Sequence, residues 1–421
     1  MHIRIAALAL FVGGLIFVPW VAGAAEPPTP GAVRADPALI QFVQTVVEAN
    51  PRVQAARAAL DASGAFRDAA SRPLYNPELS LDAENSVGDT RTLGISQTLD
   101  WGGKRKARTA VAESDRLVVE AEYLAARWSV TVELLDGLAQ HQTGVEREAL
   151  AQARREFMDR FADLAQRRFD AGDLAQVELD LARLASTDAR IQKATAGAGL
   201  AEARQAVRNL TPQSSASAQW PSLPSALPSL PKSADDPQSL VLELPEVLAA
   251  RREVATADAV VELRRRERRP DPTLSLAGGD EDGETLIGLN VTIPIFVRNS
   301  FSHEVTAALA ERSQAQQIAN DVMQRAYARL ISAAERYELS RGAWGDWQQI
   351  GEASLTRQTE QLQRLWEAGE LSTTDYLVQL TATLDVQESA LNLREALWRA
   401  WFEWLWASGQ VDAWLGRGSY Q

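Results

Sequence analysis

The fold is decided by residues 77–105, PELSLDAENSVGDTRTLGISQTLDWGGKR. Apolar and polar residues alternate on both sides of a short segment that contains Gly88 and Asp89, whereas the flanking sequence has the three- and four-residue spacing of helices. Alternation with a period of two around a Gly/Asp turn indicates a β-hairpin with one apolar and one polar face. We therefore predict strands at about 78–85 and 91–101.

The same pattern occurs a second time, about 195 residues further along the chain. Residues 272–279, PTLSLAGG, are followed by an acidic segment with a glycine and then by LIGLNVTIPIF at 286–296. This pattern predicts strands at about 273–279 and 285–295, and no other sheet is expected in the 421 residues. A repeated unit of this size indicates an internal duplication.

Long helices are expected to fill the rest of the first repeat. From Lys104 onward, apolar residues recur every three and four positions, which is the spacing of a coiled coil. A helix from there to Arg168 would be about 100 Å long at 1.5 Å per residue. Gly172, within a turn at about 169–175, is the expected C-terminal cap, and a return helix then runs to about Leu210.

The second repeat follows the same plan. Its hairpin leads into a predicted helix from about Ser300 to Trp366, a second turn at about 367–372, and a last helix that is expected to fray past Gly409. The expected domain limits are 26–210 for the first repeat, 211–237 for a Ser/Pro-rich linker and 238–421 for the second repeat. The fold class is therefore mainly α with a small β part, built from a duplicated unit of helix, hairpin, long helix and return helix.

The N-terminus has the pattern of a secretory signal peptide. A short basic start, an apolar stretch from Ile5 to Val18 and the small residues at 22–25 predict that residues 1–25 are removed. No later run of about 18 uncharged apolar residues exists, so no transmembrane helix is predicted. The sequence has no cysteine and a net charge of −13, which excludes disulfides and argues against nucleic acid as a partner.

The apolar face of the two hairpins needs a cover, and lipid is the expected one. Four strands cannot close a barrel, and an open edge in hydrocarbon leaves backbone groups unpaired at a cost of several kcal/mol each. Three copies sharing a twelve-stranded transmembrane β-barrel would remove the edges. The residues expected to face lipid are Leu79, Leu81, Leu93, Ile95, Leu99, Leu274, Leu276, Ile287, Leu289, Val291 and Ile293.

Aromatic residues stand where the predicted strands pass into the helices. Trp101, Phe296 and Phe301 would form an aromatic girdle on the periplasmic side of the membrane. The alternative is that the hairpins pack on the helices of a soluble coiled-coil protein, and the pattern alone leaves both interpretations open.

Taken in this order and repeated, the elements resemble the TolC-type outer-membrane efflux family across nearly the whole chain after residue 25. The local signatures of the resemblance are Asn76-Pro77-Glu78-Leu79, Gln97-Thr98-Leu99, Gly102-Gly103-Lys104-Arg105, Ile293-Pro294-Ile295-Phe296 and residues 168–174, RFDAGDL. The GGKR exit from the first hairpin looks like the heavy-metal branch of the family, the partner of cobalt-zinc-cadmium pumps.

The resemblance implies a homotrimer in the outer membrane of a Gram-negative bacterium, with a long α-helical barrel in the periplasm. It also implies a periplasmic adaptor that docks at the helix tips and, through that adaptor, an inner-membrane proton-driven pump. By position, adaptor docking falls on Ala171, Gly172, Asp173, Leu174, Ala368, Gly369, Glu370 and Leu371.

Two acids match the family's closing ring at the tunnel mouth, namely Glu178 and Asp375. A further family aspartate falls on Val378, a departure that puts a double-aspartate gate in doubt. Each acid also stands in the first turn of a return helix, where capping alone would explain it.

Sequence motifs of enzymes, cofactor sites and metal sites are absent, so neither catalysis nor a bound cofactor is expected. After residue 25 only two histidines remain and they are far apart, so any metal would pass through without a dedicated protein site. The predicted function is a passive exit duct of a tripartite efflux system, and the resemblance of the GGKR exit implies heavy-metal cations as its cargo. The alternatives are a duct for drugs or other small molecules and, from a different class, a soluble periplasmic adaptor or scaffold.

Overall fold

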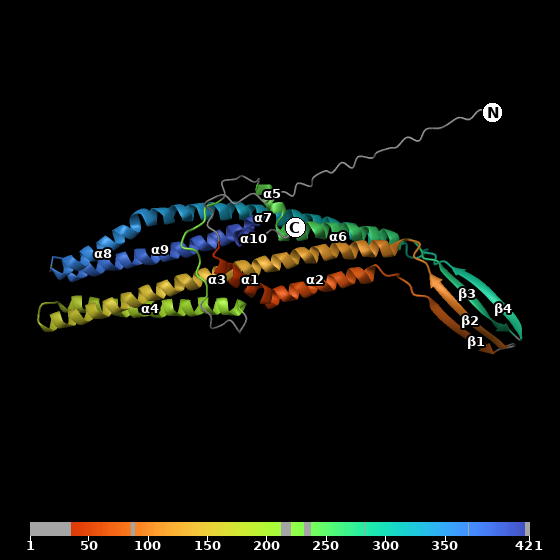
Figure 1. Ribbon diagram of the computed structural model, residues 1–421, viewed down its shortest axis with the longest axis horizontal. Coiled ribbons are helices and arrows are strands. Elements are labelled where there is room, and N and C mark those ends of the chain that lie inside the picture. Colours follow the sequence, from red (N-terminus) through yellow and green to blue (C-terminus); the bar gives the residue numbers. More distant parts are fainter. Residues whose placement is uncertain are drawn as a thin grey trace, which may run out of the picture.

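A computed structural model describes residues 35–85, 89–211, 220–230, 237–281, 283–368 and 370–416 (Figure 1). The molecule is elongated, with a β-sheet at one end and the turns of two helical hairpins at the other. Between the ends run the long helices, which are joined by a shared core near the middle. The predicted signal peptide, 1–25, lies outside the described residues.

The sheet is formed by both predicted hairpins. Its four strands are antiparallel and lie in the order β1 (Glu78–Asn85), β2 (Asp89–Thr98), β3 (Thr273–Glu281) and β4 (Glu284–Thr292). The two hairpins, about 190 residues apart in sequence, are joined by pairing of β2 with β3, from Thr90 opposite Glu281 to Thr98 opposite Thr273. The duplicated segments therefore make one sheet.

Strands β2 and β4 end three residues earlier than the predicted limits of 101 and 295. After β2, the Asp100 carboxylate accepts hydrogen bonds from the backbone N–H groups of Lys104 (2.7 Å) and Arg105 (2.8 Å), which turns the chain into a helix. After β4, Pro294 has no N–H group to donate to a ladder. The acidic segment between β3 and β4 is also shorter than predicted, because Gly283, at φ 91°, allows a tight turn.

The first repeat contains α1 (Pro37–Ala49), α2 (Pro51–Ala70), α3 (Lys104–Asp170) and α4 (Gln176–Leu210). The last two are the predicted long helix and return helix. The Asn50 side chain accepts a hydrogen bond from the backbone N–H of Arg52 (2.9 Å), so it caps α2. At 67 residues, α3 extends from the sheet to the far turn as one helix.

The second repeat contains α5 (Pro237–Leu242), α6 (Pro245–Glu267), α7 (Ser302–Asp346), α8 (Glu352–Glu367), α9 (Thr373–Ser408) and α10 (Val411–Trp414). The prediction of one helix from 300 to 366 is wrong, because a π-helix at Trp347–Gly351 separates α7 from α8. Gly351 lies against the Trp347 indole, where a Cβ would meet the ring at 2.3 Å. Only glycine fits this position without a shift of the ring.

The C-terminal segment packs on the body of the protein. The prediction that the chain frays past Gly409 is therefore wrong for the residues described up to Gly416. Gly409 caps α9 at φ 74°, and the short α10 follows directly. Val411 and Leu415 are fully buried, and the Trp128 indole N–H donates to the Asp412 carboxylate (2.8 Å). This hydrogen bond ties the C-terminal segment to α3.

The main core lies at mid-length, where both repeats meet. It includes residues of α1, α3, α7, α9 and the segment after α9, among them Val43, Leu134, Tyr337, Leu397, Phe402 and Leu415. Residues 220–230 of the predicted linker pass over this region: the Leu223 N–H donates to Gln142 Oε1 (3.0 Å), and the Tyr337 hydroxyl donates to the Pro228 carbonyl. The described part of the linker is therefore packed against the protein.

Candidate functional site

One face of the sheet is apolar from edge to edge. Leu79, Ile95, Leu276 and Leu289 are cross-strand partners and form a single row over β1, β2, β3 and β4. The next row on the same face of the sheet contains Leu81, Leu93 and Ile287. All of the residues predicted to face lipid are exposed in the single chain.

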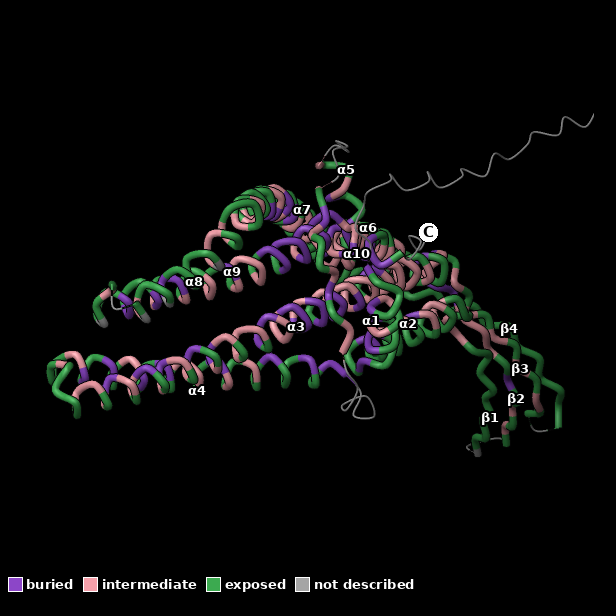
Figure 2. The backbone as a smooth tube through the Cα atoms, turned by 60° about the vertical axis from the view of Figure 1, so that its left-hand side comes forward, coloured by how far each residue is buried: buried purple, intermediate pink, exposed green. Residues whose placement is uncertain are grey.

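The opposite face of the same strands is mostly small or polar. One of its rows pairs Ser80, Gly94, Ala277 and Gly288, and the row nearest the helices pairs Thr98, Thr273 and Thr292. Figure 2 shows the outer strands β1 and β4 as exposed, whereas β2 and β3 alternate between exposed and intermediate residues and contain one buried residue, Gly94. Among the described residues, no helix lies over either face of the sheet. The sheet therefore presents an uncovered apolar surface on one side and a polar surface on the other.

The turn between α3 and α4 is a tight helix cap. Gly172 has a φ of 82°, and the Asp173 N–H donates to the Arg168 carbonyl (2.9 Å), as in a Schellman motif. The turn between α8 and α9 repeats this bond, with the Glu370 N–H donating to the Leu365 carbonyl (2.9 Å). Gly369, one of the predicted docking residues, lies outside the described residues.

The other predicted docking residues stand at these two turns, side by side at the end opposite the sheet (Figure 1). Of these, Leu174 and Leu371 pack against the apolar cluster behind the turns, and Asp173 and Glu370 are exposed. The turns thus combine a rigid backbone with a charged rim.

Both predicted aperture acids take part in local capping bonds. The Glu178 carboxylate accepts from the Ala175 backbone N–H (3.2 Å). The Ser372 hydroxyl accepts from the Asp375 N–H (3.1 Å) and donates to the Asp375 carboxylate (2.7 Å). The capping interpretation is therefore observed, and the ring of acids stays a prediction about the assembled protein.

Behind the turns, an aromatic cluster joins the two repeats. Phe161 of α3 lies 5.4 Å from Trp366 of α8 and 6.0 Å from Tyr376 of α9, measured between ring centroids. Phe161 and Tyr376 are almost fully buried. The two helical hairpins are therefore held together near their tips by packing that the sequence reasoning did not anticipate.

An arginine forms a second bridge between the hairpins. Arg154 of α3 donates to the Asp385 carboxylate of α9 (2.9 Å) and lies 3.9 Å from Asp188 of α4. Its side chain is only 6% exposed, whereas Asp385 is 58% exposed, so solvent screens one partner of the pair. The bridge therefore depends more on the geometry of the hydrogen bond between Arg154 and Asp385 than on the attraction between their charges.

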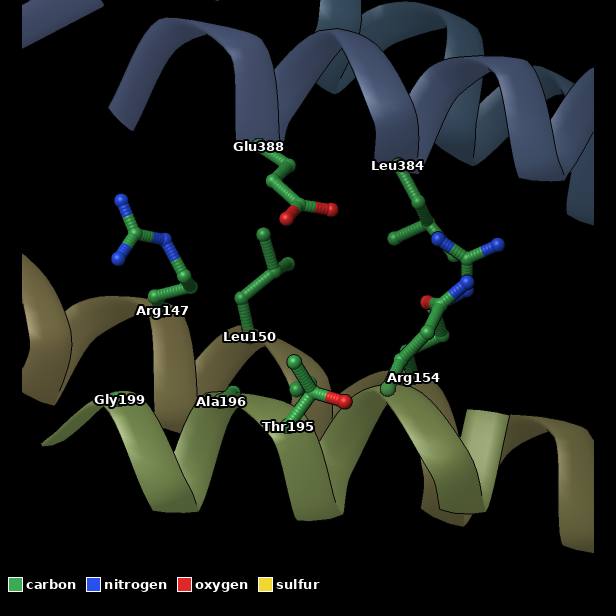
Figure 3. A pocket seen from close by; sticks show the side chains of 10 residues that line it. Arg147, Leu150, Arg154, Thr195, Ala196, Gly199, Leu384 and Glu388 are labelled. Atoms are coloured by element: carbon green, nitrogen blue, oxygen red, sulfur yellow. The ribbon is translucent and has the colours of Figure 1, made fainter. Parts of the chain in front are cut away.

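Arg154 stands at one end of a cavity of about 290 Å³ between α3, α4 and α9 (Figure 3). Arg147 and Glu388 line the same cavity, with Leu150 and Leu384 supplying apolar walls. Arg147 is bound to Asn392 (2.6 Å) and Glu395 (3.0 Å) of α9. The cavity lies between α9 on one side and α3 and α4 on the other.

Where the sheet meets the helices, three residues from both repeats share a buried contact. Asp271 accepts from the Tyr75 hydroxyl (2.8 Å) and from the Lys104 ammonium (2.9 Å). Burial, followed by the hydrogen bond to Asp271 and its negative charge, raises the pKa of Tyr75 to about 12. Lys104 belongs to the GGKR signature, so its part in the fold is to fix the hairpins relative to the helices.

The described parts of the chain contain no group of three or more His, Cys, Asp or Glu side chains able to hold a metal ion. None of their helices combines the length and the hydropathy of a membrane span.

Sequence comparisons find similarity to efflux proteins over part of this chain. Residues 42–212 match the family model described as outer membrane efflux protein. The cobalt-zinc-cadmium resistance protein CzcC of Cupriavidus metallidurans is 31% identical over 262 residues, which are 60% of this chain and 62% of that protein. The nickel-cobalt-cadmium resistance protein NccC of Alcaligenes xylosoxydans xylosoxydans is 25% identical over 281 residues, 64% of this chain and 63% of that protein. This chain thus spans less than two thirds of the length of these curated relatives.

The fold agrees with that of a solved outer-membrane channel over a larger share of the chain. The CmeC outer membrane channel of Campylobacter jejuni superposes with a TM-score of 0.75 at 18% sequence identity, covering 92% of this chain and 91% of that one. The predicted fold of the single chain, mainly α with a small sheet, is confirmed.

Proposed function

We propose that this chain is a member of the outer membrane efflux protein family and forms the outer-membrane channel of a tripartite efflux system for heavy-metal cations. It provides a passive exit duct, and the energy for transport comes from a pump in the inner membrane. The predicted efflux family and the channel fold agree with this role, because the long helices and the sheet are the parts that such a duct needs.

The observation that carries the proposal is the uncovered apolar face of the sheet. Leu79, Ile95, Leu276 and Leu289 form one exposed row across all four strands, whereas the two cores lie among the helices. Lipid covers such a face at no desolvation cost, and the polar opposite face then lines water.

The sheet requires partners at its two edges. β1 and β4 are the outer strands, and each pairs on one side only among the described residues. Unpaired backbone groups in hydrocarbon cost several kcal/mol each, so an open edge cannot stay in lipid. Three copies, with β4 of one pairing to β1 of the next, give a closed sheet of twelve strands.

The helices supply the periplasmic length and the docking surface. At 67 residues, α3 reaches about 100 Å from the membrane junction to its turn. The turns at 171–174 and 368–371 place charged rims at that end, where the hairpins of a periplasmic adaptor would dock. The inner-membrane pump is engaged through that adaptor.

The cargo is inferred from the relatives and from charge. CzcC and NccC are named for resistance to cobalt, cadmium, and either zinc or nickel. A net charge of −13 attracts cations to a tunnel wall. Metal ions are cargo in this proposal, and they pass without a coordinating site.

Two measurements test the proposal. Cell fractionation with heated and unheated gels should find an outer-membrane trimer that dissociates on heating, and a soluble monomer in the periplasm would contradict the channel. A deletion strain should lose resistance to cobalt, zinc or cadmium while its sensitivity to drugs is unchanged. The reverse profile would keep the duct and reject the metal cargo.

A further inference from the structure

The junction between sheet and helices is positively charged, although the chain as a whole carries a net charge of −13. Segments 100–108 and 262–271 contain nine Lys or Arg residues and four Asp or Glu residues. The two segments are neighbours in space, because the Arg266 guanidinium donates to the Gly103 carbonyl (3.4 Å) and Lys104 pairs with Asp271 (2.9 Å). The junction therefore concentrates positive charge where α3 begins and α6 ends (Figure 1).

All four acids of the two segments already have partners. Asp100 caps α3, and Asp271 pairs with Lys104. Glu262 pairs with Arg266 (2.9 Å), and Glu267 pairs with Arg264 (2.8 Å). With all four carboxylates counted against the nine cations, the two segments keep an excess of five positive charges.

Six exposed cations form no ion pair with any residue that the structure describes. They are Arg105, Lys106, Arg108, Arg265, Arg268 and Arg269. Like charges on neighbouring segments repel one another, and an anionic partner would lower this repulsion.

A hollow lies beside one of these cations, Arg269. It has a volume of about 300 Å³ and is lined by Trp101, Gly102, Arg269, Pro270, Pro272 and Ile293. Trp101 is 76% exposed, and Ile293 continues the alternation of Leu289 and Val291 on the apolar face. The hollow therefore combines one guanidinium with exposed apolar groups at the end of the apolar face.

We infer that this hollow binds the phosphate headgroup of an anionic phospholipid in the membrane leaflet nearest the helices. The inference rests on the proposed function, because it needs the sheet to stand in a membrane. A guanidinium matches the oxygens of a phosphate with two parallel hydrogen bonds. The Trp101 indole has the amphipathic character of side chains at the headgroup level. The other five cations attract the surrounding anionic surface.

The ligand is phospholipid and not lipopolysaccharide, because of its position. The hollow lies at the helix end of the strands, whereas the turns of the hairpins lie at the opposite end of the sheet. Lipopolysaccharide belongs to the leaflet that those turns would reach. The strands thus separate the hollow from the outer leaflet.

The test uses the full-length protein assembled in bilayer discs with equal amounts of phosphatidylglycerol and phosphatidylcholine. Retained lipids are counted by native mass spectrometry after release into detergent. The parent should retain phosphatidylglycerol preferentially, and Arg269→Gln should lower that preference about fivefold, the effect of one cation at an anionic surface. Arg269→Lys should keep part of the preference, and Trp101→Ala should lower total retention.

Arg160→Gln is the matched control, because it removes an exposed cation from α3 far from the hollow. It should leave lipid retention unchanged. An unchanged ratio in Arg269→Gln, or displacement of phosphatidylglycerol by added lipid A at equal concentration, would overturn the inference. If Arg269→Gln fails to assemble, the parent protein alone decides the test. The inference is then overturned if the parent shows no preference for phosphatidylglycerol. Failure of the parent to enter bilayer discs would instead contradict the proposed function.

Discussion

The Tyr376 ring stacks on the Trp366 indole across the turn that joins α8 to α9, with centroids 4.8 Å apart and planes 7° from parallel. Both rings also touch Phe161 of the first repeat, and the Arg168 guanidinium lies 5.4 Å from the Trp366 ring centroid. Aromatic contacts of this kind contribute about 0.5–1.5 kcal/mol each beyond the burial of area. The tips of the two hairpins are therefore coupled through one cluster.

Phe161→Ala should uncouple the hairpins near their tips. Truncation of a buried phenylalanine costs about 3–5 kcal/mol. Because the cluster is local, the loss should appear as faster hydrogen exchange in residues 157–165 and 362–380, with the core around Leu397 unaffected. Phe66→Ala is the control, because Phe66 is 70% exposed. Unchanged exchange at α8 and α9 would show that the hairpins are held together elsewhere.

Arg154→Gln should weaken the second bridge between the repeats. Only 6% of the Arg154 side chain is exposed, so its loss removes packing as well as the hydrogen bond to Asp385. We expect a local destabilisation of about 1–3 kcal/mol. Asp385→Asn should cost less, since that carboxylate is already screened by solvent. Site-specific hydrogen exchange in α9 measures both, and equal effects of the two variants would contradict this order.

The junction should respond to alkaline pH through Tyr75. Burial, the hydrogen bond to Asp271 and its charge raise the pKa of Tyr75 from 10 to about 12. The folded protein therefore binds more protons than the unfolded chain between these values. The contribution of Tyr75 to stability is complete below pH 10 and is lost as the pH rises to about 12.

This pKa is measured by titrating the absorbance of tyrosinate in the parent and in Tyr75→Phe. The difference between the two titration curves belongs to Tyr75. Asp271→Asn should lower the pKa of Tyr75, because the charged acceptor is lost. The value should stay above 10, since burial is the largest cause of the shift. A pKa of 10 in the parent would show that the Tyr75 hydroxyl is hydrated and not bound to Asp271.

Gly172→Ala should strain the turn between α3 and α4. A Cβ at this position meets nothing within 4 Å, so the only cost is the left-handed backbone at φ 82°, about 1–2 kcal/mol for a residue other than glycine. Local hydrogen exchange at residues 168–176 should accelerate accordingly. Gly197→Ala is the matched control inside α4, where a Cβ is also free, and it should stabilise the helix by up to about 1 kcal/mol. The same sign at both positions would contradict the argument.

The sheet and its apolar face were predictable because strand periodicity is fixed by the backbone. Alternation alone identified Leu79, Ile95, Leu276 and Leu289, and pairing then placed them in one row. The π-helix was not predicted, because the contact between Gly351 and Trp347 arises within one irregular turn and leaves the apolar spacing intact. A cluster of glycines at 342, 345 and 351 was the available signal.

The contacts between the repeats could not be predicted. Periodicity indicates which face of a helix is buried but not which helix covers it. Phe161 and Arg154 stand on the buried face of α3, yet their partners Trp366 and Asp385 are more than 200 residues away. Likewise, Leu184 and Ile191 of α4 are 66% and 61% exposed in the single chain. The sequence does not indicate what covers this surface.

Asp375→Asn separates a capping role from a ring of charge at the tunnel mouth. The Asp375 N–H bond to Ser372 Oγ uses the backbone and is retained, and an asparagine side-chain oxygen still accepts from the Ser372 hydroxyl. The helix should therefore lose only the dipole contribution of the charge, about 0.3–1 kcal/mol.

Three carboxylates around a narrow mouth favour cations. We expect the cation-over-anion permeability of trimers in planar bilayers to fall in Asp375→Asn, and to fall again in the double variant with Glu178→Gln. Asp346→Asn, at the end of α7 and far from the turns, is the control. Equal selectivity in all variants would leave both acids as helix caps and nothing more.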